Sequence, residues 1–123
     1  MSDRPFQKPF PVIVNASMAQ SITSLPTILN QKSGAGYDIS WTGTPTGTFS
    51  VEISNTYSVD GEGNTANPGK WTPVTLSAPI TASGSPDNAF INLAGLECYA
   101  MRLVYTFTGG SGVLNAVVCS KVQ

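Results

Sequence analysis

The sequence predicts an all-β domain, either a sandwich or a barrel. Its 12 glycines and 9 prolines divide the chain into short runs, and within these runs β-branched and aromatic residues alternate with polar ones. No heptad repeat and no long amphipathic pattern indicates a helix. With 123 residues the chain has the length of one domain and can bury a core without disulfides or metal ions.

The first expected element is an extended N-terminal arm. Residues 1–11 hold three prolines, which fix φ and remove backbone donors. We expect this arm to contact either its own domain or a neighbouring molecule. The single sandwich domain then occupies residues 12–123. Its expected strands are residues 12–15, 19–24, 26–31, 37–42, 48–55, 71–77, 89–93, 99–107 and 113–118.

Alternation within the strands indicates which side chains face the core. In residues 37–42 and 48–55, large apolar side chains occupy the odd positions and polar ones the even positions. Because successive side chains of a strand point to opposite faces, the odd set is predicted to face inward. These positions are Tyr37, Ile39, Trp41, Phe49, Val51 and Ile53.

The last two strands are predicted to form a closing hairpin. The loop Gly109–Gly112 has four residues, which places the apolar odd positions of residues 99–107 and the apolar even positions of residues 113–118 on the same face. Val104 and Val117 would then pair on the outward face. We expect a loop, the arm or a neighbouring subunit to cover them.

The same register keeps the two cysteines apart. Cys119 would lie opposite Arg102, four residues along the strand from Cys98. That separation is about 13 Å, whereas a disulfide requires Cα atoms within about 7 Å. We therefore expect no disulfide between them, as in a protein made in the cytoplasm.

Charge and composition exclude several classes of protein. The net charge is −1 and the basic residues are scattered, so no basic stripe indicates nucleic-acid binding. No apolar run approaches the roughly 20 residues of a membrane span, and the N-terminus has no continuous apolar segment of a secretory signal. Histidine is absent, and the seven acidic residues form no recognisable catalytic motif. We therefore expect no enzyme, no catalytic residue, no cofactor and no metal.

The polar stretch between Tyr57 and Lys70 has two interpretations. In residues 60–64, Asp60 and Glu62 place oxygen ligands at alternate positions, as calcium loops do. An EF-hand loop would need a glutamate where Trp71 stands, so that match fails. A solvated turn is the main interpretation, and a weak cation site is the alternative.

The aromatic residues Trp41, Trp71 and Tyr57 also have two interpretations. Aromatic side chains on strands usually pack in the core, whereas exposed ones on a groove would stack on sugar rings. We expect core packing for the tryptophans and exposure for Tyr57. The glycine-rich residues 109–112 lack the lysine and the helix of a phosphate loop, so they are interpreted as a turn.

Several short motifs follow one another in a specific order. Trp41-Thr42-Gly43 leads into the stretch 47–51, Trp71-Thr72-Pro73-Val74 follows the long loop, and residues 101–106 and 110–116 close the chain. This ordered pattern resembles a group of small β-sandwich proteins from the virions of tailed bacteriophages. The resemblance covers most of the chain. It fails in the polar loop from Tyr57 to Lys70, which lacks the compact turn expected at this point in the resembling virion proteins.

The resemblance implies a jelly-roll or discoidin-like sandwich without catalytic residues. It implies a capsid decoration (cement) protein that binds between major capsid subunits and stabilises the DNA-filled head. A tail, baseplate or head-fibre component and a host-glycan-binding module are the alternatives. The expected partners are the phage major capsid protein and copies of the chain itself, as a dimer or trimer, with no direct nucleic acid and no membrane. The expected location is the capsid surface, after synthesis in the host cytoplasm. The expected interface residues are Arg4, Phe6, Phe10, Tyr57, Asp60, Glu62, Val104 and Val117.

Overall fold

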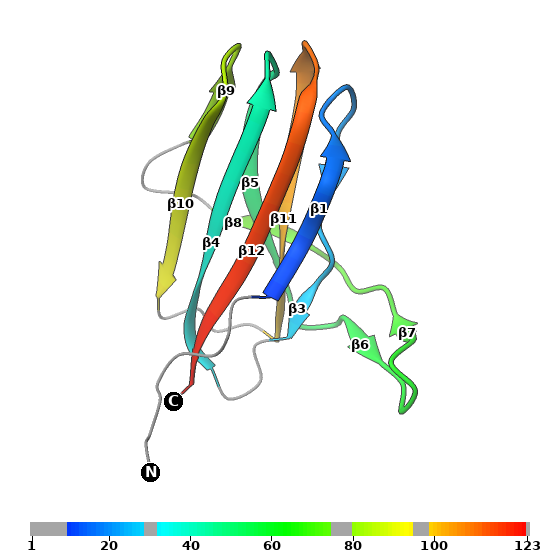
Figure 1. The fold of residues 1–123 in the computed structure, drawn as a ribbon. Helices are drawn as coiled ribbons and strands as arrows, with labels where there is room; N and C mark the ends of the chain where they lie inside the picture. Colours follow the sequence, from blue (N-terminus) through cyan, green and yellow to red (C-terminus); the bar gives the residue numbers. More distant parts are fainter. Residues whose placement is uncertain (1–9, 29–31, 75–79, 95–98, 123) are drawn as a thin grey trace.

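Twelve β-strands and no α-helix make up the part of the chain that the computed structural model describes, which is residues 10–28, 32–74, 80–94 and 99–122 (Figure 1). The prediction of an antiparallel, all-β sandwich is therefore confirmed. The strands are β1 (Phe10–Ser17), β2 (Ile22–Thr23), β3 (Thr27–Ile28), β4 (Lys32–Gly43), β5 (Thr46–Ser54), β6 (Ser58–Val59), β7 (Thr65–Asn67), β8 (Thr72–Val74), β9 (Ile80–Ser83), β10 (Asp87–Ala94), β11 (Ala100–Gly109) and β12 (Gly112–Val122).

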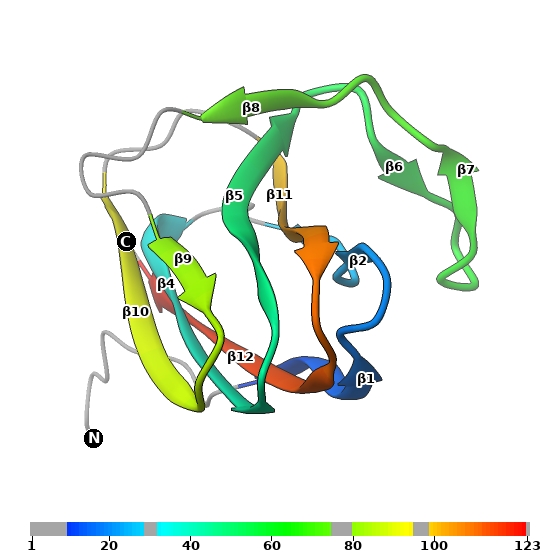
Figure 2. The same ribbon diagram turned by 90° about the horizontal axis from the view of Figure 1, so that it is seen from above.

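Two antiparallel sheets pack face to face, as the view from above shows (Figure 2). We name the sheet with strand order β1-β12-β4-β10 sheet A, and the sheet with order β2-β11-β5-β8 sheet B. In sheet B, β3 also pairs with β11 and β9 also pairs with β5. Strands β6 and β7 pair only with each other among the described residues.

The core lies between the two sheets, and the inward positions predicted from alternation are confirmed. Tyr37, Ile39 and Val51 are fully buried, and Ile53 packs against the same cluster. An aromatic chain crosses the core. The rings of Trp41 in sheet A and Phe49 in sheet B lie 5.2 Å apart, and the ring of Tyr105 lies 5.0 Å from that of Phe49. Each such pair contributes about 0.5–1.5 kcal/mol beyond the burial of its area.

Tyr105 is a buried ionisable group of this core. Its hydroxyl donates to the backbone carbonyl of Thr46 at 2.9 Å. Burial removes water from the tyrosinate form and raises the pKa of Tyr105 above its ordinary value of 10.0. The hydroxyl therefore stays neutral and holds β11 to β5.

The predicted closing hairpin is wrong, because its two strands belong to different sheets. β11 pairs with β5, β2 and β3, whereas β12 pairs with β4 and β1. The turn of residues 109–112 therefore connects sheet B to sheet A. Met101 and Leu103 still face inward, as do Leu114 and Ala116. An inter-sheet connection satisfies this alternation as well as a hairpin does, since both apolar sets then face the core from opposite sides.

The residues expected on one outward face are consequently separated. Val104 lies opposite Ser50 on the outer face of sheet B, and Val117 lies opposite Asp38 on the outer face of sheet A. Both valines are half-buried, but they do not form one surface. Cys119 lies opposite Gly36 rather than Arg102, and residue 98 is outside the described residues.

Four connections at one end of the sandwich cross between the sheets: β1 to β2, β4 to β5, β9 to β10, and β11 to β12 (Figure 1). Backbone hydrogen bonds join them. Met18 donates to Gly112 at 2.9 Å, Thr44 donates to Ser111 at 2.8 Å, and Gly84 donates to the carbonyl of Pro45 at 2.7 Å. These bonds connect the four turns in a row, so this end of the sandwich is closed by backbone contacts.

Several strand boundaries differ from the prediction, most of all in β4, which begins at Lys32 rather than at Tyr37. β1 begins at Phe10, and Pro11 lies opposite Val117, so the last two residues of the predicted arm belong to sheet A. Residues 1–9 lie outside the described residues. β9 occupies a stretch expected to be a loop, because Ile80 and Ala82 pack against the core while the polar Thr81 and Ser83 face out.

Candidate functional site

The polar stretch after β5 is a β-hairpin that projects from the sandwich (Figures 1 and 2). We name residues 55–70 the hairpin arm. Ser58 pairs with Asn67 and Val59 with Thr65, and residues 59–68 are all exposed. The tip of the arm therefore buries nothing in the core, which leaves its surface open for a contact outside the domain.

Side-chain hydrogen bonds join the two limbs of the arm at its base. The buried Ser54 hydroxyl accepts from the backbone N–H groups of Thr56 and Tyr57, both at 3.1 Å. The Thr56 hydroxyl accepts from the backbone N–H of Lys70 at 2.7 Å. A Cβ on Gly69 would lie 2.8 Å from the Ser54 hydroxyl oxygen, so the limbs approach too closely for a larger residue. The arm is thus held in one orientation where it leaves the sheet.

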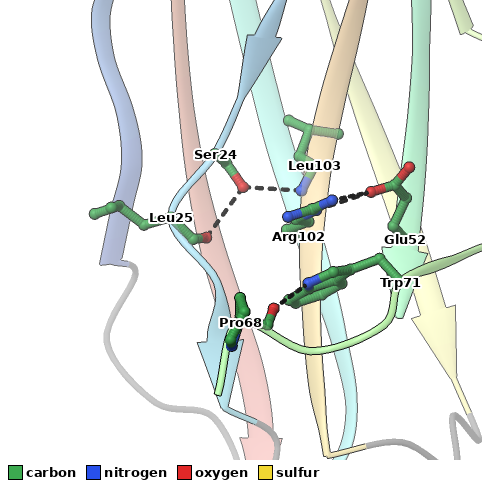
Figure 3. A network of polar contacts seen from close by, with 7 residues as sticks. All are labelled: Ser24, Leu25, Glu52, Pro68, Trp71, Arg102 and Leu103. Carbon is green, nitrogen blue, oxygen red and sulfur yellow. Dashed lines mark hydrogen bonds and ion pairs between the residues drawn. The ribbon is translucent and has the colours of Figure 1, made fainter. Parts of the chain in front are cut away.

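Trp71 attaches the arm to the outer face of sheet B (Figure 3). Its indole Nε1 donates to the backbone carbonyl of Pro68 at 2.8 Å, and its ring lies 5.7 Å from that of Tyr57. The guanidinium carbon of Arg102 lies 4.2 Å from the centre of the Trp71 ring. Arg102 also forms an ion pair with Glu52, with Nη2 and Oε1 2.7 Å apart. We name these four side chains, Tyr57, Trp71, Arg102 and Glu52, the aromatic–arginine cluster.

The placement of the cluster corrects two expectations. Trp41 packs in the core as predicted, but Trp71 is half-buried on the outer face, so its predicted core position is wrong. Tyr57 is half-buried against Trp71 rather than freely exposed. A cation over an aromatic face contributes about 0.5–2 kcal/mol, depending on how far water is excluded. The cluster therefore serves first to hold the arm on the sheet.

The tip of the arm closes on the Asp60 carboxylate. Its Oδ1 accepts from the backbone N–H groups of Glu62 at 2.8 Å and Asn64 at 3.0 Å. The backbone N–H of Asp60 donates to the carbonyl of Asn64 at 2.8 Å. Because this carboxylate is engaged by its own loop, the geometry favours the solvated-turn interpretation over the cation site. Among the described residues, no three acidic or cysteine side chains gather as ligands for a metal ion.

A shallow hollow lies on the outer face of sheet A. Its volume is about 320 Å³, and its lining residues come from β4, β10 and β12. Cross-strand pairing places Asn88, Ser40 and Asn115 in one row across these strands. The hollow therefore offers amide and hydroxyl groups for hydrogen bonds. It contains no aromatic platform, since its lining residues are Asp38, Ser40, Asn88, Asn115, Ala116 and Val117.

The described residues predicted at an interface fall in four different places. Tyr57, Asp60 and Glu62 share the hairpin arm, with Asp60 and Glu62 exposed. Val104 and Val117 lie on opposite outer faces, as described above. Phe10 is 59% exposed at the start of β1, and residues 4 and 6 are outside the described part of the chain.

Sequence reasoning missed two features of the surface. The first is the contact of Arg102 with Glu52 and Trp71, which depends on the registers of β11 and of β8 against β5, the strand between them. The second is Phe90, which is 61% exposed on the outward face of β10. The sequence could have indicated the exposure of Phe90. Side chains of a strand alternate between its faces, and the neighbours Ala89 and Ile91 occupy the inward positions, so Phe90 faces outward.

Neither the scan of protein families nor the search of curated proteins finds a match for this chain. Within the described ranges, no helix has the length and apolar character needed to cross a bilayer.

Proposed function

We propose that this chain is a non-enzymatic structural protein of a bacteriophage virion. In this proposal it is a decoration protein that binds between major capsid subunits and strengthens the DNA-filled head. The observation that carries the proposal is the hairpin arm. Hydrogen bonds hold its base against the end of β5, and residues 59–68 toward its tip are exposed. The order of sequence motifs that resembles small virion sandwiches supports it.

The order of the strands supports the jelly-roll form of this class. Counting β2 with β3 and β8 with β9, each sheet has four strands. Consecutive strands exchange sheets at the closed end of the sandwich, as in double-sheet jelly rolls. We therefore infer a jelly roll rather than the discoidin-like alternative.

The arm explains how such a protein would strengthen a shell. A segment that is already ordered loses little conformational freedom on docking, so more of its contact energy remains as binding energy. A protein that binds the assembled shell but not free subunits stabilises the shell by mass action. Many copies, each making a modest contact, together oppose the opening of the joints between capsomers.

No specific observation favours the glycan-binding alternative. The aromatic side chains predicted to stack on a sugar, Tyr57 and Trp71, are engaged with each other and with Arg102 on sheet B. The ring of the exposed Phe90 on sheet A lies over Gly36 and does not line the hollow. The hollow, in contrast, lies on sheet A and is lined by polar and small side chains. A platform and a hollow at one place would be needed for a sugar site.

The test is to challenge virions by salt or heat with the protein removed and then added back, and to measure DNA retention and bound copies. We expect DNA loss without the protein and recovery when it saturates the shell. Intact heads without it, with few copies bound or with adsorption to cells lost instead, would assign the chain to the tail or to host recognition.

A matched pair of variants tests the role of the arm. Glu62→Gln and Asp38→Asn each neutralise one exposed carboxylate, the first at the arm tip and the second on sheet A. We expect Glu62→Gln to weaken binding to the shell and Asp38→Asn to leave it unchanged. The reverse result would show that the shell is bound through sheet A and that the arm has another role.

A further inference from the structure

The free edge of β10 is the feature that the proposed function does not use. β10 pairs with β4 in an unbroken register over all eight of its residues, from Asp87↔Trp41 to Ala94↔Gly34. No described strand lies on its other side (Figures 1 and 2). A regular edge strand presents a row of backbone N–H and C=O groups, which are the natural partners of another strand.

The other edges are protected against such pairing. On the opposite edge of sheet A, β1 contains Pro11, two register shifts, and Asn15 with φ at +49°. Proline and irregular backbone at an edge prevent regular pairing. In sheet B each edge is divided between two short strands, β2 with β3 and β8 with β9. Among the described strands, β10 is therefore the one long and regular edge.

We propose that β10 pairs antiparallel with β10 of a second copy, so that two copies of sheet A become one continuous sheet about a two-fold axis. The inference does not rest on the proposed function. A second copy is the favoured occupant because the strand is complementary to itself. Its single charged residue, Asp87, lies at one end, so antiparallel pairing keeps the two copies of this charge far apart.

Alternation limits the register of this pairing, and the two asparagines of the strand select one of the registers that it allows. Residues opposite each other in an antiparallel pair share a face, so the exposed positions of one copy must oppose exposed positions of the other. Centring the pair on Phe90 places this residue opposite Phe90 of the second copy, and Asn88 opposite Asn92 of the second copy. The buried Ile91 then lies opposite Ala89 of the second copy on the core side. From Asn88 to Asn92, amide faces amide and apolar faces apolar, and Asp87 lies opposite Leu93 of the second copy at each end of the pairing.

The position of the Phe90 ring agrees with this register. A Cβ on Gly36 would lie 2.6 Å from the tip of the ring, so the ring lies over β4 rather than across the free edge. The backbone groups at the edge stay open, while the outer surface of the ring remains uncovered. Because both copies use the same edge, that of β10, the pairing closes as a dimer and does not extend into a filament.

Sedimentation velocity over about 1–300 µM protein tests the proposal. We expect a reversible dimer for the wild type. Phe90→Lys should weaken association at least tenfold, because two lysines would then lie opposite each other. Val14→Lys is the control, since Val14 is 64% exposed on the other edge of sheet A, and it should dimerise like the wild type. The circular-dichroism spectra of both variants should match that of the wild type.

A charge-swap mixture tests the register itself. Phe90→Lys and Phe90→Glu should each be monomeric alone, whereas their equimolar mixture should recover the dimer as a heterodimer. A wild type that stays monomeric at the highest concentration would overturn the proposal and leave the edge for a foreign strand. Equal effects of Phe90→Lys and Val14→Lys, or a mixture that stays monomeric, would overturn the pairing through Phe90.

Discussion

Replacing Gly110 by alanine should destabilise the whole sandwich more than the same change at Gly84. Both glycines have positive φ, +75° and +88°, which costs an alanine about 1–2 kcal/mol. A Cβ on Gly110 would also overlap the backbone carbonyl of Thr44, whereas a Cβ on Gly84 meets nothing within 4 Å. The two variants therefore share the backbone cost and differ by one steric contact.

The size of that difference follows from what has to move. The carbonyl of Thr44 belongs to a turn that is fixed by the hydrogen bond from its own N–H to Ser111, so it cannot withdraw without opening the joined turns. Inserting a methyl group into such a packed site costs about 1–3 kcal/mol. We expect Gly84→Ala to lower the free energy of unfolding by about 1 kcal/mol and Gly110→Ala by about 3 kcal/mol.

Urea titration and thermal unfolding measure the difference. For a chain of 123 residues, each kcal/mol lowers Tm by about 4 °C, so decreases of about 4 °C and about 12 °C are expected. Equal losses in the two variants, within about 0.5 kcal/mol, would refute the reasoning. They would mean that the joined turns yield easily and do not contribute to global stability.

Three further predictions concern single interactions. A double-mutant cycle of Arg102→Ala and Trp71→Ala, measured by urea unfolding, should give a coupling of about 1 kcal/mol; a coupling near zero would mean that the arginine does not hold the tryptophan. Ser24→Ala should cost about 1–3 kcal/mol, because the buried N–H of Leu103 loses the acceptor that it reaches at 2.8 Å (Figure 3); a loss below 0.5 kcal/mol, again by urea unfolding, would contradict this. Burial raises the pKa of Tyr105, so the unfolded chain loses this proton first and the free energy of unfolding should fall as pH rises above about 10. In unfolding curves taken between pH 9 and about 11.5, Tyr105→Phe should reduce the dependence of this free energy on pH. An unchanged pH dependence would exclude Tyr105 as its source.

Side-chain alternation was sufficient to predict the core but not the path of the chain. The positions of Tyr37, Ile39 and Leu103 follow from period-two patterns that any half-buried strand shows. The connection through residues 109–112 could not be predicted in this way. A hairpin and an inter-sheet turn both bring the apolar faces of their strands toward the core. What distinguishes them is the backbone contact of Gly110 with Thr44, which joins segments far apart in sequence.

The sequence indicated where the candidate site lies in the chain but not which side chains contact one another there. The run of glycine, asparagine and aspartate after β5 indicated a polar excursion, and the Asp60 turn within it uses local hydrogen bonds. The attachment of the arm depends on Arg102 and Glu52 meeting across β11 and β5, and on Trp71 folding over them. These residues are distant in the chain, so their contact appears only when the sheet is assembled.

The free edge of β10 and the hairpin arm lie on opposite sides of the sandwich (Figures 1 and 2). A dimer joined through β10 would therefore carry its two arms at its two outer ends, where each could reach a different neighbour. Two tethered contacts bind with an effective concentration that a monomer lacks. Phe90→Lys should then weaken binding to shells while the arm stays intact, and Glu62→Gln should weaken binding while the dimer stays intact. Equal shell binding by the Phe90→Lys monomer and the wild type would show that each arm acts alone, whatever the state of the dimer in solution.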